Sequence, residues 1–299
     1  EGTIRGGAKG CCRYGSSSFL LGCTLSYNER YDLLYRICIG AAGRISVEKE
    51  ELYLVKKSQT DAQNGTVIFK AFTNNSGSGD ITVEYNNGKR GKNPECKAIR
   101  RMSVLSQMQS RLPSDIEKYA QTIKTIQYVQ TTLSNMFVLE PIPSLMRGYS
   151  RIGDSVLRRN CSNISAVLAS IQENSPDDWQ KFCDIIESLP ENEIQGISFV
   201  KTTINDVILI QKEQNGKSTE NIDATRLSDG TLRCIAVLAA VISEPEHSLI
   251  AIEELDNGIH PSRIIKLIKS LCEIAQRRKI DLVLTTHNVT VLNGLSKED

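Results

Sequence analysis

Two short apolar runs near the end of the sequence constrain the fold more than any other feature. Leu249–Ile252 is followed at once by Glu253 and Glu254, and the run 282–284 is followed by two threonines and His287. A segment with helical spacing lies between the two runs. Apolar runs that alternate with helices are typical of parallel strands buried on both faces of an α/β sheet. The last third of the chain is therefore predicted to contain such a sheet.

The first third of the chain has a different pattern. Its apolar and aromatic runs are divided by turn residues, and they cover 19–21, 33–37, 52–55, 67–69 and 81–85. Short runs of this kind predict an antiparallel meander. Helical spacing follows, with Pro141 and Pro143 expected to end the first long helix. We expect three parts: an antiparallel β lobe over 1–110, a helical lobe over 111–190 and a core lobe over 191–299.

Composition excludes several classes of protein. The net charge is +1, so no overall field attracts nucleic acid or a membrane. The nine cysteines are scattered and no pair has CxxC spacing, so neither a zinc site nor a disulfide framework is predicted. This usage points to the reducing cytoplasm. No apolar stretch approaches the ~20 residues of a membrane helix, and the sequence starts without the apolar region of a signal peptide.

The segment 227–231 has the composition of a phosphate-binding turn. Ser228, Asp229, Gly230 and Thr231 stand directly before a predicted helix. A small turn at a helix N-terminus exposes backbone N–H groups at the positive end of the helix dipole. A plain helix cap with Ser228 as the N-cap residue explains the same residues, so the segment alone leaves both interpretations open.

The polar residues after the two apolar runs suggest chemistry on a phosphate. In open α/β sheets ligands bind beyond the carboxyl ends of the strands. There one of Glu253 and Glu254 can hold Mg²⁺, while the other polarises an attacking water. His287 is placed to reach a γ-phosphate. Taken singly, solvated acids and a structural histidine explain these residues equally well.

Together and in this order, the three segments resemble the second half of the ABC-type ATPase core. The resemblance implies an α/β fold: an ABC-type head with an antiparallel β lobe, a helical lobe and a mixed, largely parallel core sheet. It also implies ATP and Mg²⁺ as cofactors and a homodimer that clamps ATP between its two copies. The implied roles are signature loop for Ser228, Asp229, Gly230 and Thr231, magnesium-side acid for Glu253, catalytic glutamate for Glu254, D-loop for Asp256 and Asn257, and switch histidine for His287.

Details of these motifs resemble the RecF- and SMC-related branch, and within it the ATPases of bacterial antiphage systems. Asp229 replaces a glycine usual in transporters, and the acids are paired glutamates. Arg147 and the run 160–164 are similar to the ATPase subunit of Septu-type systems, which also occurs in some retrons. The resemblance implies a cytoplasmic switch that regulates a separate nuclease subunit of the HNH type, with nucleic acid as a further possible partner.

Three other functions remain open at this point. The chain is also compatible with the ATPase portion of a fused Toprim nuclease of the overcoming-lysogenization-defect or Gabija type. A RecF-like DNA-repair clamp is the second alternative, and a scaffold that binds nucleotide or a partner without turnover is the third. The family's phosphate-binding loop, GxxxxGK[S/T], does not occur in the sequence. The glycine-rich segment 6–10 does not match this motif, since its spacing is different. We expect that loop upstream of Glu1, and Gln107 as the residue that senses the γ-phosphate.

Overall fold

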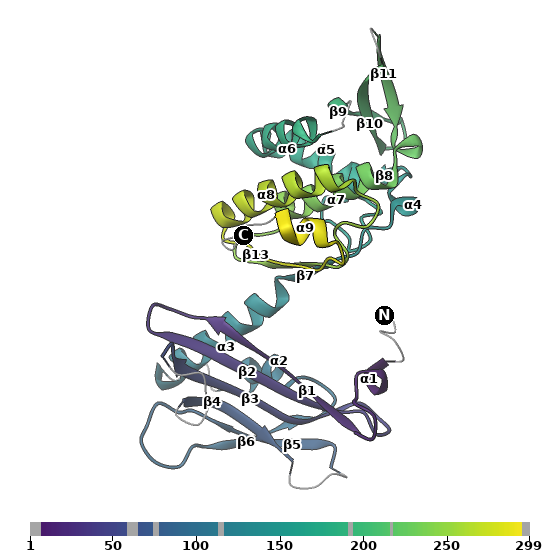
Figure 1. The fold of residues 1–299 in the computed structure, drawn as a ribbon. Coiled ribbons are helices and arrows are strands. Elements are labelled where there is room, and N and C mark those ends of the chain that lie inside the picture. Colours follow the sequence, from purple (N-terminus) through teal and green to yellow (C-terminus); the bar gives the residue numbers. More distant parts are fainter. Residues whose placement is uncertain are drawn as a thin grey trace. The chain divides into compact units, whose positions relative to one another are not determined.

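The computed structural model describes residues 7–58, 65–73, 78–112, 117–190, 194–215 and 218–294. The chain forms two compact units, Glu1–Ser134 and Asn135–Asp299 (Figure 1). The first unit contains a six-stranded antiparallel sheet, and the second contains one parallel and one antiparallel sheet. The predicted mixed α/β class is therefore confirmed. Among the described residues, no helix is long and apolar enough to cross a membrane.

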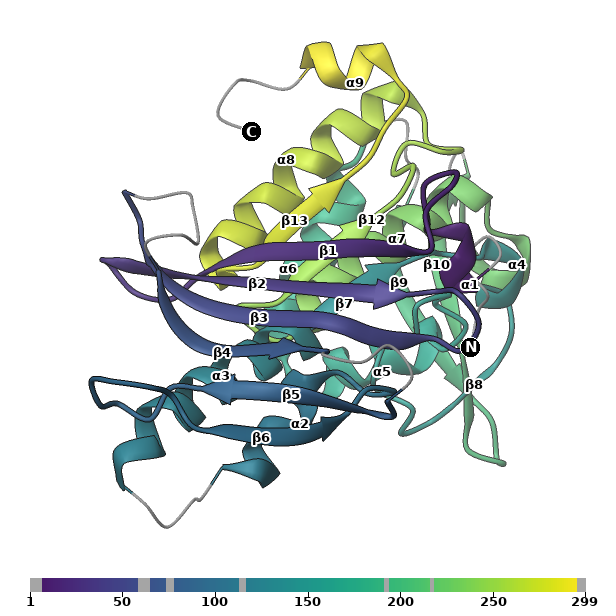
Figure 2. The same ribbon diagram turned by 90° about the horizontal axis from the view of Figure 1, so that it is seen from below.

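The first unit is a meander whose strands pair in sequence order, with two helices packed on one face (Figure 2). Its strands are β1 (Ser18–Ser26), β2 (Tyr31–Gly40), β3 (Ser46–Lys56), β4 (Thr66–Phe72), β5 (Asp80–Tyr85) and β6 (Glu95–Ile99). Its helices are α1 (Gly7–Gly10), α2 (Val104–Arg111), η2 (Glu117–Tyr119) and α3 (Ala120–Ser134). Five of the six strands follow the predicted runs, and β6 was not predicted. Leu33, Phe69 and Ile126 are fully buried in the core that joins the sheet to α2 and α3.

A buried carboxylate holds α2 against the sheet. Glu50 of β3 is completely buried, and it accepts hydrogen bonds from the backbone N–H groups of Val104 (2.7 Å) and Leu105 (2.8 Å). The hydroxyls of Ser103 (2.9 Å) and Tyr35 (3.0 Å) donate to the same side chain. The N-cap residue of α2 makes no side-chain cap of its own. Glu50 therefore satisfies two of the free N–H groups at the start of this helix, where an acidic side chain also complements the helix dipole.

The helices of the expected helical lobe belong to both units. α3 packs on the meander, whereas α5 (Ile164–Asn174) and α6 (Pro176–Ser188) share the core of the second unit. The chain divides between residues 134 and 135, and not near 110 and 190. The physical reason is that the apolar faces of these helices cover different sheets. The spacing within each helix carries no information about which sheet it covers.

The second unit is layered (Figure 1). Its parallel sheet has the order β13-β12-β7, formed by Asp281–Leu284, Leu249–Ile252 and Met136–Leu139. Helices α7 (Asp229–Ser243) and α8 (Pro261–Arg278) pack against this sheet, and α5 and α6 pack against α7. A second sheet lies on α5 and α6, and it contains β8 (Ser150–Arg151), β9 (Ile194–Lys201), β10 (Asp206–Asn215) and β11 (Ser218–Asp223). The short elements are α4 (Pro143–Met146), η3 (Ala224–Arg226) and α9 (Val289–Gly294).

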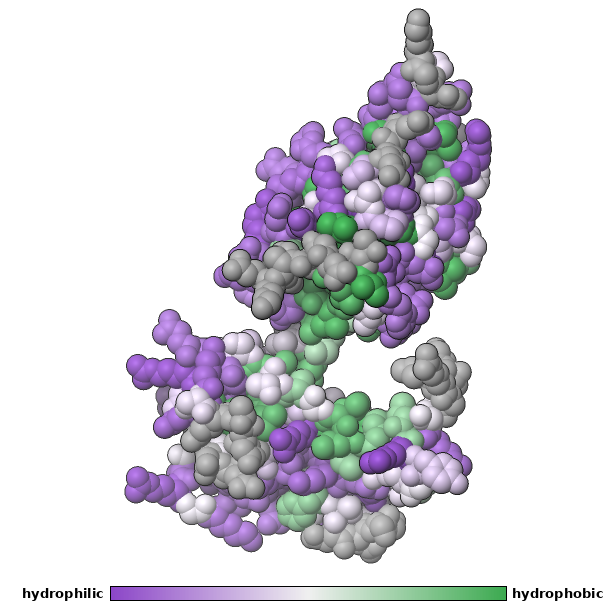
Figure 3. Space-filling view, viewed as in Figure 1, coloured by the Kyte–Doolittle hydropathy of each residue, from purple (hydrophilic) through white to green (hydrophobic). Residues whose placement is uncertain are grey.

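The parallel sheet differs from the prediction in two ways. The first long helix ends at Ser134, and not at the prolines, because Met136–Leu139 forms the strand β7 beside β12. Within the second unit taken alone, the strands are also not covered on both faces. Ile250 and Ile252 face the core, but Val283 on the opposite face is 49% exposed, and apolar surface is visible at this sheet in Figure 3. Helices cover only one face of the sheet within the described part of the unit.

Thiol reactivity gives a first test of the packing. All nine cysteines are free thiols, and burial raises the pKa of Cys161 and of Cys234 to about 12. At pH 8 each should present roughly a thousandfold less thiolate than an ordinary thiol. We expect a thiol-specific disulfide reagent to label exposed Cys11 quickly, and Cys161 and Cys234 only after denaturation. Peptide mass spectrometry of the labelled sites would check this, and fast labelling of Cys234 would contradict the burial of α7.

Candidate functional site

The carboxyl ends of the three parallel strands bring polar residues together. Leu139, Ile252 and Leu284 are in register across the sheet. The residues that follow them are Glu140, Glu253 and Thr285, which therefore begin three neighbouring loops at one edge of the sheet. This is the edge at which ligands bind in open α/β sheets.

The loop after β12, which we call the acidic turn (253–259), has an unusual backbone. Glu254 has a φ of 49°, in the left-handed region that non-glycine residues seldom adopt. Its N–H donates to Thr285 Oγ1 (3.0 Å), and the N–H of Leu255 donates to the Thr285 carbonyl oxygen (3.1 Å). These bonds hold Glu254 in the left-handed conformation, which costs a non-glycine residue about 1 kcal/mol or more relative to an ordinary backbone conformation. The strain is located at the residue for which catalysis was predicted.

His287 lies beside Glu254, as their expected joint role requires. The distance from His287 Nε2 to Glu254 Oε1 is 3.8 Å, and both side chains are well exposed. His287 belongs to the segment after β13, which we call the switch segment (285–288). In this segment Thr286 Oγ1 donates to Asp256 Oδ1 (2.6 Å), so three hydrogen bonds join the acidic turn to the switch segment.

The segment 227–231, which we call the serine–glycine turn, forms the N-terminus of α7. Ser228 is the N-cap residue, and its Oγ accepts from the N–H of Thr231 (3.1 Å). Ser228 therefore caps the helix, and this cap does not decide whether the turn also binds a phosphate. Arg147, which follows α4, binds this turn through its side chain. Its Nη2 donates to the Leu227 carbonyl oxygen (2.9 Å) and to Asp229 Oδ1 (2.6 Å). The capped turn still leaves Ser228 and Asp229 exposed.

The serine–glycine turn and the acidic turn are in contact. Gly230 is buried in the first turn of α7 and packs against the backbone of Gly258 and Ile259. Asn257 is exposed, and its N–H donates to the Glu254 carbonyl oxygen (2.9 Å). The structure thus brings together every residue predicted for the site in the second unit: Ser228, Asp229, Gly230, Thr231, Glu253, Glu254, Asp256, Asn257 and His287.

The side chains at this edge fit a weakly held hard cation. Glu253 is exposed directly after the end of β12, and Mg²⁺ is commonly bound by one or two carboxylates together with waters and phosphate oxygens. No group of three histidine, cysteine, aspartate or glutamate side chains within the described ranges forms a complete metal cage.

In the first unit, the surroundings of Gln107 argue against the role expected for it. Gln107 is buried, and its side-chain amide is used by the backbone: Oε1 accepts from the N–H of Ile99 (2.9 Å), and Nε2 donates to the Ile99 carbonyl oxygen (2.9 Å) and to that of Ser103 (3.2 Å). With these partners it stabilises the start of α2 and is not free to sense a phosphate. The glycine-rich segment forms the short helix Gly7–Gly10, and Gly6 lies outside the described residues.

One polar residue at the sheet edge was missed from the sequence. Glu140 follows β7, and its carboxylate lies 3.6 Å from Nη2 of Arg159. The N–H of Glu140 also donates to the Arg159 carbonyl oxygen (2.9 Å). The apolar run before Glu140 could have indicated a strand that ends at this residue. The run is only four residues long and closely follows a helix.

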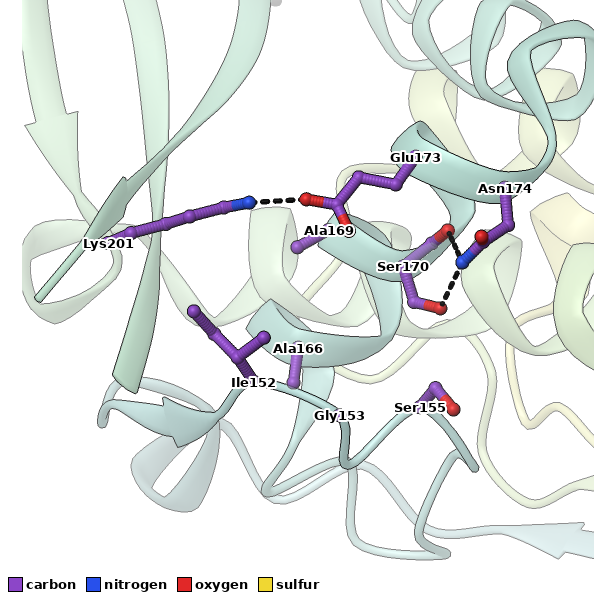
Figure 4. A pocket seen from close by; sticks show the side chains of 9 residues that line it. All are labelled: Ile152, Gly153, Ser155, Ala166, Ala169, Ser170, Glu173, Asn174 and Lys201. Carbon is purple, nitrogen blue, oxygen red and sulfur yellow. Dashed lines mark hydrogen bonds and ion pairs between the residues drawn. The ribbon is translucent and has the colours of Figure 1, made fainter. Parts of the chain in front are cut away.

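A pocket elsewhere in the second unit does not coincide with this site. It lies between α5, β9 and the loop after β8, and Figure 4 shows Ile152, Gly153 and small residues of α5 around it. Its charged side chains, Lys201 and Glu173, form an ion pair with each other. Since the pocket shares no residue with the sheet edge, we do not assign it to the same chemistry.

Comparisons with known proteins place this geometry in context. A family model described as "AAA domain, putative AbiEii toxin, Type IV TA system" matches residues 112–293. Among solved structures, the chain is similar to the "Crystal structure of the SmcHead bound to the C-winged helix domain of ScpA", with 8% sequence identity and a TM-score of 0.38. That alignment covers 78% of this chain and 71% of the other. A search of the curated proteins returned no match.

Proposed function

This chain belongs to the AAA-domain family described as "putative AbiEii toxin, Type IV TA system", and from that membership we propose that it hydrolyses ATP at the edge of its parallel sheet. The observation that carries the proposal is the pairing of Glu254 and His287, 3.8 Å apart at the ends of neighbouring strands. A carboxylate and an imidazole at this edge match the requirements of phosphoryl transfer to water.

Each residue of the site has a distinct task in this proposal. Glu254 orients the attacking water and accepts its proton, and its exposed carboxylate is available for that. His287 donates a hydrogen bond to the terminal phosphate. Glu253 would hold Mg²⁺ through water, and the cation would supply neutralisation of the charge on the phosphate oxygens. The described residues contain no phosphate-binding glycine-rich loop. The proposal therefore concerns the residues that activate water and bind Mg²⁺ and the terminal phosphate.

We further propose that two copies of the chain share each nucleotide. Ser228 and Asp229 are exposed at the N-terminus of a long buried helix, where N–H groups favour an anion. The resemblance of this turn to a signature loop supports its use toward ATP held by a second copy. A pair of copies related by a twofold axis then forms two equivalent sites.

The proposed task of this ATPase is to regulate a separate nuclease in antiphage defence. The motif variants around Arg147 and Asp229 support this through their likeness to Septu-type ATPase subunits. The family description points to an alternative task as the toxin of a toxin–antitoxin pair. The two tasks differ in the protein that acts on the cell or the phage. In the first case it is a nuclease partner, and in the second it is this chain alone.

Nucleotide-dependent association tests the proposal. We expect the purified full-length protein to hydrolyse ATP only with Mg²⁺, and to shift from monomer to dimer with a non-hydrolysable ATP analogue in sedimentation. Co-expression with a candidate HNH nuclease should give DNA cleavage that changes with the nucleotide added. Absence of both turnover and nucleotide-dependent association would reject the ATPase. Toxicity of this chain alone, without any nuclease, would favour the toxin alternative.

A further inference from the structure

The loops that follow the three parallel strands are acidic. Residues 140–142, the acidic turn and the switch segment contain four carboxylates, and they contain neither a lysine nor an arginine. A nucleotide brings further negative charge to this edge of the sheet, and phosphoryl transfer depends on groups that offset it. The side chains of these loops carry no permanent positive charge with which to hold a phosphate.

The turn before α5, which we call the arginine turn (158–161), brings such a charge to the same edge. The N–H of Glu140 donates to the carbonyl oxygen of Arg159 (2.9 Å), and the N–H of Ile142 donates to that of Asn160 (3.2 Å). These bonds join the arginine turn to the residues that directly follow β7. Because β7 and β12 are paired in register, the arginine turn lies one strand away from the acidic turn.

The backbone of the arginine turn is held from the interior of the unit. Cys161 is completely buried and has a φ of 57°, in the left-handed region that a non-glycine residue adopts only when its surroundings impose it. The buried side chain of Asn163 accepts from the N–H of Arg158 (3.0 Å) and donates to the carbonyl oxygens of Asp154 (3.0 Å) and Val156 (2.7 Å). The two arginines are therefore presented by a turn with one defined conformation.

The two arginines differ in their partners. Both side chains are 60% exposed. The guanidinium of Arg158 binds Asp154 Oδ2 (2.7 Å) and Ser162 Oγ (3.4 Å). Within the described residues, the guanidinium of Arg159 has one partner: its Nη2 lies 3.6 Å from Glu140 Oε2, which is too long for a hydrogen bond. The donors of Arg159 are therefore available to a ligand.

We infer that Arg159 is a phosphate-binding residue of the proposed ATP site, on its β7 side. The inference rests on the proposed function and adds a residue to the same site. A guanidinium is permanently charged, and its fork of donors matches the oxygens of a phosphate. Stability does not explain the arrangement, because an exposed ion pair as long as that with Glu140 adds little to it.

Arg159→Ala tests the inference through binding and turnover. We expect the Kd of the full-length protein for a fluorescent, non-hydrolysable ATP analogue to rise about tenfold to a hundredfold, the effect of losing a hydrogen bond to a charged group. The kcat/KM for ATP should fall by a similar factor. Arg159→Lys keeps the charge but not the fork, so its values should lie between those of Arg159→Ala and the wild type. Added guanidinium ion should restore part of the turnover of Arg159→Ala.

Arg158→Ala is the matched control. It makes the same chemical change at the neighbouring, equally exposed side chain, whose guanidinium is already bound by Asp154. We expect its Kd and kcat/KM to equal those of the wild type. The urea midpoint of the second unit, followed by the fluorescence of Trp179, should be the same for both alanine variants and the wild type. Weaker binding of Arg159→Ala with a lower midpoint and no rescue by guanidinium would show a structural role and overturn the inference.

The outcomes separate this inference from the proposed function. Equal Kd and kcat/KM for Arg159→Ala and Arg158→Ala, in a protein whose wild type hydrolyses ATP, would overturn the role of Arg159 and leave the proposed function standing. A wild type that binds the analogue without turnover would reject ATP hydrolysis, and the Kd values would still decide the role of Arg159. A wild type that neither binds nor hydrolyses ATP would reject both.

Discussion

Glu254→Gln should lower the rate of ATP hydrolysis by about 10²- to 10⁴-fold, the usual contribution of a positioned general base. Glutamine has the shape of glutamate but cannot accept the proton of the attacking water. ATP binding should persist, since the side chain acts on the water and not on the nucleotide. We would measure phosphate release in single-turnover reactions, and binding with a fluorescent ATP analogue.

The same unit offers a matched control for this substitution. Glu246 is an exposed acid in the loop before β12, so Glu246→Gln makes the same chemical change away from the strand ends. It should hydrolyse ATP at the wild-type rate. Glu253→Gln should instead raise the Mg²⁺ concentration needed for half-maximal turnover. Wild-type hydrolysis by Glu254→Gln would mean that the base lies elsewhere and that the strained backbone at this residue has another cause.

Glu50→Ala should destabilise the first unit by several kcal/mol, since each buried donor left without its acceptor costs about 1–3 kcal/mol. The substitution leaves the N–H groups of Val104 and Leu105 and two hydroxyls without their acceptor. Urea unfolding followed by far-ultraviolet circular dichroism would measure the loss. Fluorescence of Trp179, the single tryptophan, reports the second unit separately and assigns the loss to the first.

Two further variants make this prediction specific. Glu95→Ala removes a half-exposed acid of β6 that lies 3.5 Å from Lys92, and it should cost less than about 1 kcal/mol. Glu50→Gln keeps the shape but loses the charge, so its cost should fall between those of Glu95→Ala and Glu50→Ala. Equal stability of Glu50→Ala and the wild type would show that α2 does not depend on this cap.

The pH dependence of this contribution has a definite sign. Burial raises the pKa of Glu50 above its ordinary value of 4.5, and hydrogen bonds from Leu105, Val104, Ser103 and Tyr35 oppose the rise. The folded unit therefore binds this proton more tightly than the unfolded chain does. The added stability that comes from this tighter proton binding is complete below pH 4.5 and is lost as the pH rises through the raised pKa. The hydrogen bonds that Glu50 accepts from α2 are a separate contribution. The non-titrating Glu50→Gln should remove this part of the pH profile.

The sequence predicted the local elements around the candidate site better than it predicted the sheet that carries them. The strand β12, the helix α7 and the cap at Ser228 all follow from local patterns, because apolar runs, turn residues and helix starts are encoded by neighbouring residues. The closeness of Glu254 and His287 followed from one added rule, that ligands bind at the carboxyl ends of parallel strands.

The failures have a common physical cause. The strand β7 is four residues long, and its partner β12 lies more than a hundred residues later, so nothing nearby distinguishes it from the end of a helix. Without β7, Glu140 had no predicted place at the sheet edge. Gln107 was chosen for its position along the chain, but the structure shows its amide bonded to the backbone near Ile99. Burial of a side chain depends on contacts that local spacing does not encode.

The order in which the strands pair has a consequence for how the chain acquires its structure during synthesis. The meander joins β1 to β6 in sequence order, so each hairpin closes a short loop and the first unit needs nothing beyond Ser134. The parallel sheet cannot assemble until β12 and β13 have left the ribosome, and β7 must wait for them with its apolar residues uncovered. The segment that ends in Glu140 is therefore exposed to aggregation or chaperone binding until more than a hundred further residues have been synthesised.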